Sequence, residues 1–126
     1  GDLIETKLTL ALHDTKSAGM DILLNFNPKV IVIKEIKPEP LVAIMPSQNI
    51  HKDGILSMSL LAGPGETLEE THHVVTIVWQ ALAVGVSEVK FVFEPGITDD
   101  TNVAEFGTGQ DILSTIVNAQ YIIVKK

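Results

Sequence analysis

Apolar side chains in this chain recur at every second position rather than at every third or fourth. Leu8, Leu10 and Leu12 alternate with Thr9 and Ala11. The same period of two returns in residues 21–26, 30–34, 56–60, 74–80, 89–93 and 121–124. Successive side chains of a β-strand point to opposite faces, so this period is typical of strands with one buried face. The sequence therefore predicts a protein built mainly of β-strands.

Turn signals separate these segments at short intervals. Asn27-Pro28 follows one predicted strand, and further Gly and Pro clusters lie at residues 38–40, 52–54, 63–65, 95–96 and 107–109. Many short strands joined by such turns indicate a sandwich or a barrel. Helix signals are weak: residues 67–72 and 111–114 each predict one turn at most. We expect a single all-β domain over residues 1–126.

The charge balance argues against two classes of partner. The chain has nine Lys, no Arg and 16 Asp and Glu, for a net charge of −7. Proteins that bind nucleic acids or anionic membranes need clustered cations, so we expect neither partner. The apolar run Val30–Ile33 is far too short to span a membrane. With no Cys, the chain has no disulfide and no thiolate metal site.

Catalytic and metal-binding patterns are weak. His72 and His73 are adjacent, so on a strand they point to opposite faces and a shared metal ion is not expected. No Ser lies in a G-x-S-x-G elbow. Paired carboxylates from distant strands stay an alternative. The oxygen-rich turn at Asp99, Asp100 and Asn102 lacks EF-hand spacing, so we expect a turn there, with a calcium site as the alternative. We expect no enzyme and no cofactor.

A carbohydrate-binding module is an alternative, because many such modules are β-sandwiches. These modules stack sugar rings on exposed aromatic side chains. The natural candidates here, Trp79 and Tyr121, occupy alternating strand positions that predict burial. The supply of aromatic side chains is therefore too small for a sugar-binding platform.

Several segments match one family pattern in the right order. Gly1-Asp2 and the strand after it resemble "GD-x-V", and residues 18–28 resemble "AGFDFTLKYDP" in spacing. Residues 30–36, 52–62, 75–78 and 102–112 follow in order, and residues 118–124 are similar to a closing "NGSVTV". The pattern resembles the cohesin domains of cellulosome scaffoldins and their non-cellulosomal relatives. One strand of that family, upstream of Gly1-Asp2, has no counterpart here, which would leave residues 122–124 as an open edge able to pair between chains.

The resemblance implies a two-sheet jelly-roll sandwich of about eight or nine strands. It also implies a non-catalytic function: one sheet face binds a dockerin, a small helical module that carries calcium. Contact with polysaccharide would be indirect, through partner proteins, and the location would be extracellular or at the cell surface. The remaining alternative is a structural or adhesin domain of a surface protein.

The same resemblance points to one face. The polar recognition residue of the family falls on Asp21, and the Asn that accompanies it falls on Gly19, which lacks that side chain. The alternation agrees: if Ile22 and its neighbours in phase are buried, then Asp21, Leu23 and Asn25 point outward.

Two further segments complete the predicted partner-binding face. In residues 56–61 the alternation places Ser57 and Ser59 outside, unless a bulge reverses the phase and exposes the apolar residues instead. Ile50 and His51 occupy the place where relatives often have an aromatic contact.

Overall fold

The computed structural model describes residues 2–39, 42–44, 49–51, 54–62, 67–92, 101–105, 107, 113, 116–117 and 119–124. At 13–15, 18, 42–44, 49–51, 69–72, 102 and 104–105 it describes the main chain alone. The described residues contain nine strands and no helix. The strands are β1 (Leu3–Asn25), β2 (Ile31–Pro38), β3 (Val42–Ile44), β4 (Asn49–His51), β5 (Ile55–Ala62), β6 (Leu68–Ala81), β7 (Gly85–Phe91), β8 (Asn102–Glu105) and β9 (Ala119–Ile123).

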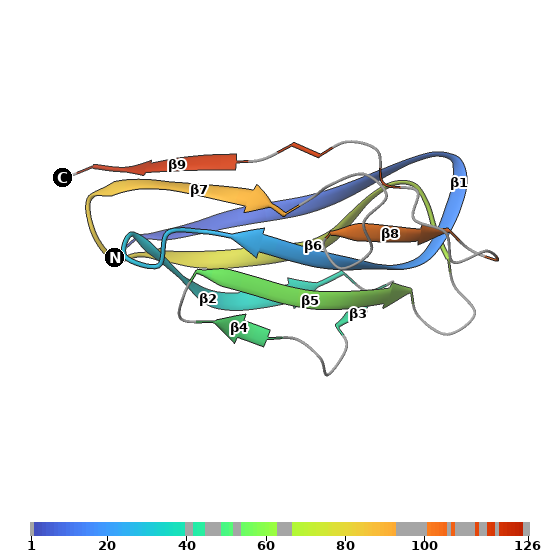
Figure 1. The fold of residues 1–126 in the computed structure, drawn as a ribbon, viewed down its shortest axis with the longest axis horizontal. Helices are drawn as coiled ribbons and strands as arrows, with labels where there is room; N and C mark the ends of the chain where they lie inside the picture. The colour runs from blue at the N-terminus through green and yellow to red at the C-terminus, as the bar shows by residue number, and fades with distance from the viewer. Residues whose placement is uncertain are drawn as a thin grey trace.

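The long strand β1 belongs to both layers of a sandwich (Figure 1). Its first half pairs with β6 along Leu3–Ala11, and β6 pairs with β2 on its other side. Its second half pairs with β5 along Gly19–Asn25 and with β8 and β7 on the opposite edge. All of these pairs are antiparallel, and the prediction of an all-β sandwich is confirmed.

The core fills the space between the two halves of β1 and the strands beside them. Alternate residues of β1, β5 and β6 point inward and are buried, as the two-residue period predicts: Leu8, Leu10, Ile22, Leu24, Leu56, Met58, Leu60, Val75, Ile77 and Trp79. Trp79 packs edge-on against Phe26, with ring centroids 4.9 Å apart. Its indole N–H donates to Thr6 Oγ1 over 2.9 Å, which satisfies its buried donor.

The start of β6 corrects one prediction. Residues 68–72 lie in a strand, not in the helical turn that their sequence suggests. Leu68 is fully buried and lies opposite Ser17 of β1, and His72 lies opposite Leu10. Pairing with the middle of β1 therefore overrides a weak local preference. The other suggested turn, 111–114, lies outside the described residues except for Leu113.

Candidate functional site

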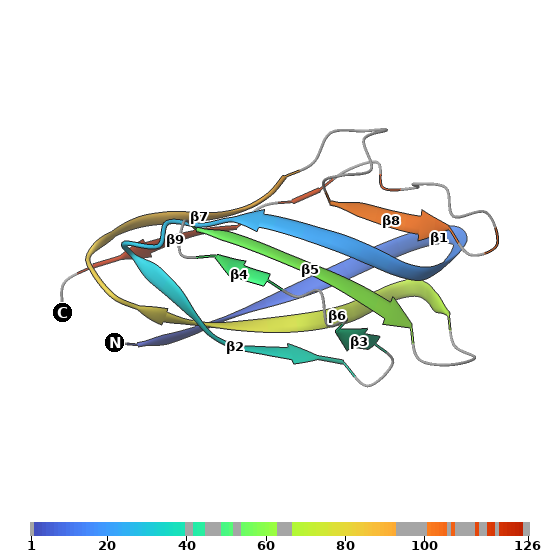
Figure 2. The same ribbon diagram turned by 60° about the horizontal axis from the view of Figure 1, so that its bottom comes forward.

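The predicted partner-binding face is the outer surface of the layer formed by β4, β5, the second half of β1 and β8 (Figure 2). The register aligns its residues in rows, because directly opposite residues share a face. Asp21 lies opposite Ser59, and Leu23 lies opposite Ser57. Leu56, Met58 and Leu60 are buried, so the burial confirms that the serines point outward and that no bulge reverses the phase.

Asp21 and Ser59 form one polar pair on this face. Ser59 Oγ donates to Asp21 Oδ1 over 2.6 Å, between neighbouring strands. Asp21 is exposed and Ser59 is half-buried. The bond restricts the orientation of the carboxylate on the outer face.

Leu23 is held more tightly than the sequence indicates. Its main-chain N–H donates to Thr101 Oγ1 over 2.9 Å, and Thr101 Oγ1 donates back to the carbonyl of Leu23 over 3.0 Å. The same carbonyl accepts from the N–H of Val92 over 2.8 Å. The Leu23 side chain is half-buried, whereas Asn25 is exposed. Three hydrogen bonds thus position the main chain at the centre of the face.

Gly19 lies where the neighbouring strand β5 leaves no space for a side chain. A Cβ at Gly19 would lie 2.6 Å from the carbonyl oxygen of Leu60 and 2.7 Å from Leu61 Cδ2. Ser17 Oγ accepts from the N–H of Gly19 over 3.1 Å and donates to its carbonyl over 2.8 Å. The close approach of β5 leaves no room for an Asn side chain without a shift of main chain.

Strand β4 brings the other two predicted residues to the edge of this layer. Its main chain sets Ile50 opposite Leu56 and His51 opposite Ile55. Of these two, the structure describes the main chain alone. Their contribution to binding therefore stays a prediction.

Two apolar residues of the face were missed by the sequence analysis. Ile55 and Leu61 of β5 are 38% and 43% exposed. The alternation could have identified them, because Ile55 lies two positions before Ser57 and Leu61 lies two positions after Ser59, so both point to the same face as the serines. The face therefore combines a polar centre with exposed apolar side chains at its ends.

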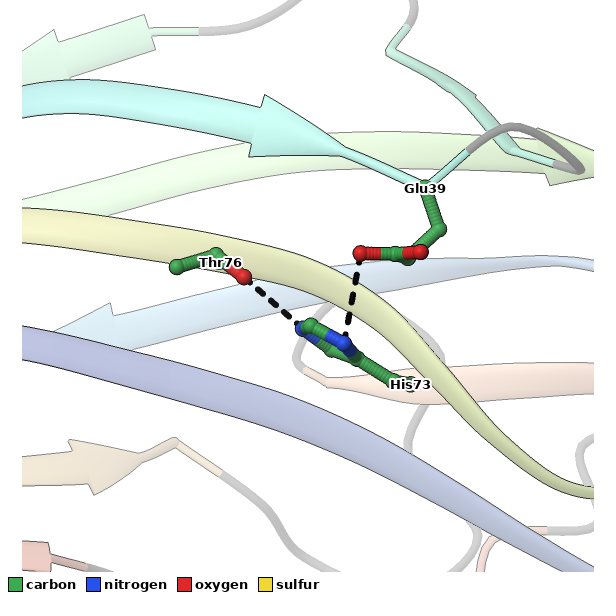
Figure 3. A network of polar contacts seen from close by, with 3 residues as sticks. All are labelled: Glu39, His73 and Thr76. Atoms are coloured by element: carbon green, nitrogen blue, oxygen red, sulfur yellow. Dashed lines mark hydrogen bonds and ion pairs between the residues drawn. The ribbon is translucent and has the colours of Figure 1, made fainter.

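His73 lies away from this face, and both of its ring nitrogens contact other side chains of the chain (Figure 3). Its Nδ1 is 3.2 Å from Glu39 Oε1, and its Nε2 is 2.8 Å from Thr76 Oγ1. Within the part of the chain that the structure describes, no three metal-ligating side chains come together. Asp99 and Asp100 lie outside the described residues, and Asn102 is described by its main chain alone.

The described aromatic side chains are engaged in the core. Trp79 is fully buried and Phe26 is buried against it. Tyr121 is half-buried, and its hydroxyl is 2.6 Å from Thr6 Oγ1. Among the described residues no aromatic ring is exposed for stacking on a sugar. No helix in this part of the chain is long and apolar enough to cross a membrane.

Comparison with solved structures shows what the fold is similar to. The third cohesin ScaC of Acetivibrio cellulolyticus, solved with the ScaB dockerin, superimposes with a TM-score of 0.76 at 12% identity, covering 99% of this chain and 91% of that one. A complex of Coh-OlpA with Doc918 from Clostridium thermocellum gives 0.74 at 18%, covering 98% and 90%. A non-cellulosomal cohesin from Archaeoglobus fulgidus gives 0.72 at 8%, covering 99% and 83%.

No protein-family model matches the sequence, and no curated protein matches it. The sequence identities to these solved structures are low, so the similarity shows a shared fold alone. The chain has the cohesin fold over nearly its whole length.

Proposed function

We propose that this chain is a non-catalytic interaction module that binds a dockerin-type partner on the outer face of β5 and the second half of β1. The observation that carries the proposal is the cohesin fold, shared with structures solved as cohesin–dockerin complexes. The partner would supply the calcium, since dockerins are calcium-loaded modules. Such a module would act outside the cell or at its surface, and polysaccharide would be reached through partner proteins.

The composition of the face supports this location. Asp21, Leu23, Asn25, Ser57 and Ser59 lie on two paired strands of one layer. They combine a fixed hydrogen-bonding carboxylate with apolar area from exposed neighbours on β5. Interface hot spots need such groups in positions from which a partner can exclude water. Ile50 and His51 extend the proposed face on β4.

Gly19 makes the expected partner different from that of a cohesin with Asn at this position. The Asn hydrogen bond is absent, and the approach of Leu60 prevents its restoration by substitution. Asp21 then carries more of the polar recognition. We therefore expect the chain to select among dockerins rather than to bind all of them.

The test is a titration of purified, calcium-loaded dockerin modules, beginning with those of the complexes named above. We expect at least one to bind, and binding to be lost when a chelator removes calcium. The double variant Asp21→Ala plus Asn25→Ala should weaken that binding by about 1–3 kcal/mol, roughly five- to 150-fold. The matched control is Glu5→Ala plus Thr9→Ala, two exposed positions on the other layer.

Two results would contradict the proposal. If no dockerin module of the panel binds a chain that melts cooperatively, the function is not that of a cohesin. If the Asp21 and Asn25 variant binds as well as the Glu5 and Thr9 control, the site lies on another face.

A further inference from the structure

Two neighbouring rows of the proposed partner-binding face differ in chemistry. The strands β8, β1, β5 and β3 lie side by side in that order (Figure 2). Directly opposite residues of paired strands share a face. The first row, called the apolar row below, contains Ala104, Gly19, Leu61 and Ala43. The second, two residues along each strand, is the polar row and contains Asn102, Asp21 and Ser59.

Leu61 is the exposed side chain of the apolar row. It is 43% exposed, and its Cδ2 lies 2.7 Å from the position that a Cβ of Gly19 would take. Gly19 is itself buried although it has no side chain. The Leu61 methyl group therefore lies against the main chain of Gly19, and a partner that reaches this part of the face meets an apolar surface.

The main chain at Gly19 is already hydrogen-bonded within the chain. Its N–H donates to Ser17 Oγ over 3.1 Å, and its carbonyl accepts from the same hydroxyl over 2.8 Å. A hydroxyl or amide that a partner pressed against Leu61 would lose its water and meet a methyl group in exchange. An apolar side chain would instead bury the exposed part of Leu61, which is favourable. The apolar row thus discriminates against a polar contact.

The polar row makes the opposite demand. Ser59 Oγ donates to Asp21 Oδ1 over 2.6 Å, and Asp21 is exposed. An ionised carboxylate accepts hydrogen bonds and repels a second acid brought close to it. The group of the partner that meets Asp21 is therefore a donor or a cation and not an acid.

We propose that Leu61 determines which dockerin-type partner binds: the partner places an apolar side chain against Leu61, one helical turn away from the group that meets Asp21. This inference rests on the proposed function and adds the chemistry of the partner's contact residues. The two rows are about 7 Å apart, because each strand residue spans about 3.3 Å. Helix residues four apart are separated by about 6 Å along the axis and share one side, so a single helix presents both groups.

The test uses the wild-type chain and the calcium-loaded dockerin of the titration panel that binds it most tightly. Each surface position of the dockerin helices is changed in turn to Leu, Ser and Asp. Calorimetry then measures the binding of every version to the wild type and to the variants Leu61→Asn, Leu61→Met and Asp21→Asn. Leu3→Asn is the matched control, because Leu3 is 60% exposed and lies on the other layer, opposite Gln80. Melting temperatures show that each variant is folded.

We expect Leu61→Asn to weaken binding at least about tenfold, because it places an amide in an apolar contact. Leu61→Met and Leu3→Asn should change binding by less than about threefold, since the first keeps an apolar side chain of similar volume. One dockerin position should bind the wild type more tightly with Leu than with Ser, and should lose that preference on Leu61→Asn. A position one turn away should bind weakly with Asp on the wild type and no longer so on Asp21→Asn.

The outcomes separate this inference from the function on which it rests. If a dockerin binds the wild type but binds Leu61→Asn as well as Leu3→Asn, the inference is overturned and the proposed function stands. The same holds if no dockerin position prefers Leu to Ser. If no dockerin binds the folded wild-type chain, the proposed function and this inference are both overturned.

Discussion

Asparagine at position 19 is the residue that the cohesin pattern suggests and that this structure excludes. A Cβ there would lie 2.6 Å from the carbonyl oxygen of Leu60, a main-chain atom of a fully buried residue. It would also lie 2.7 Å from Leu61 Cδ2, which can move because Leu61 is partly exposed. The carbonyl cannot rotate away, since the register sets Leu60 opposite Met20 and Leu61 opposite Gly19 in the ladder. A side chain at Gly19 therefore forces β1 and β5 apart.

The loss of stability on substitution of Gly19 follows from overpacking. Extra atoms in a filled position cost about 1–3 kcal/mol. We expect Gly19→Ala and Gly19→Asn each to lower the free energy of unfolding by about 2 kcal/mol. For a domain of this length that lowers the melting temperature by roughly 6–10 °C. The sign of the change in stability is decisive. At a site with room for a side chain, Gly→Ala stabilises the protein by about 0.4–1 kcal/mol, because it lowers the conformational entropy of the unfolded chain.

Urea unfolding and thermal melts followed by circular dichroism measure this effect. Ser57→Asn is the matched control, because Ser57 points outward on the same layer. It should change stability by no more than about 0.5 kcal/mol. A Gly19→Ala variant as stable as the wild type, or more stable, would refute the argument that β5 approaches too closely for any side chain.

Three further predictions concern the rest of the fold. Tyr121→Phe removes the hydroxyl that meets Thr6 and should cost about 0.5–1.5 kcal/mol of stability in urea unfolding; an unchanged midpoint would mean that the contact contributes nothing. Glu39→Gln replaces the carboxylate beside His73 with a neutral amide that can still accept a hydrogen bond, and because both side chains are about one-third exposed, it should cost less than about 1 kcal/mol; a larger loss would mean that the contact is stronger than a surface pair. Gly54→Ala places a side chain at φ 82°, so its melting temperature should fall, and a rise would contradict the observed turn.

The alternation made the burial of most strands predictable. It indicated which face of residues 21–26 points inward and favoured the observed face of residues 56–60, where a bulge that reverses the phase was the alternative. It did not show that β1 runs unbroken from Leu3 to Asn25. Residues 13–19 interrupt the alternation at the point where the strand passes from one layer to the other. Only pairing with β6 on one side and β5 on the other makes the segment one strand.

The candidate face was predictable in part for the same reason. Asp21, Leu23 and Asn25 follow from phase within one strand, but the Asp21–Ser59 hydrogen bond depends on the register between two strands 38 residues apart. Phase alone does not fix register. The role of Gly19 also depends on how closely β5 approaches, which is a packing distance that no local pattern encodes.

The proposed site for a dockerin-type partner is the outer face of β5 and the second half of β1. Amide chemical shifts of the labelled chain, recorded while a calcium-loaded dockerin that binds it is added, locate the contact residue by residue. We predict that the largest changes fall on residues 19–25 and 55–61, with little change along β2 and β6. Largest changes on β2 and β6, or along Leu3–Ala11 of β1, would contradict it.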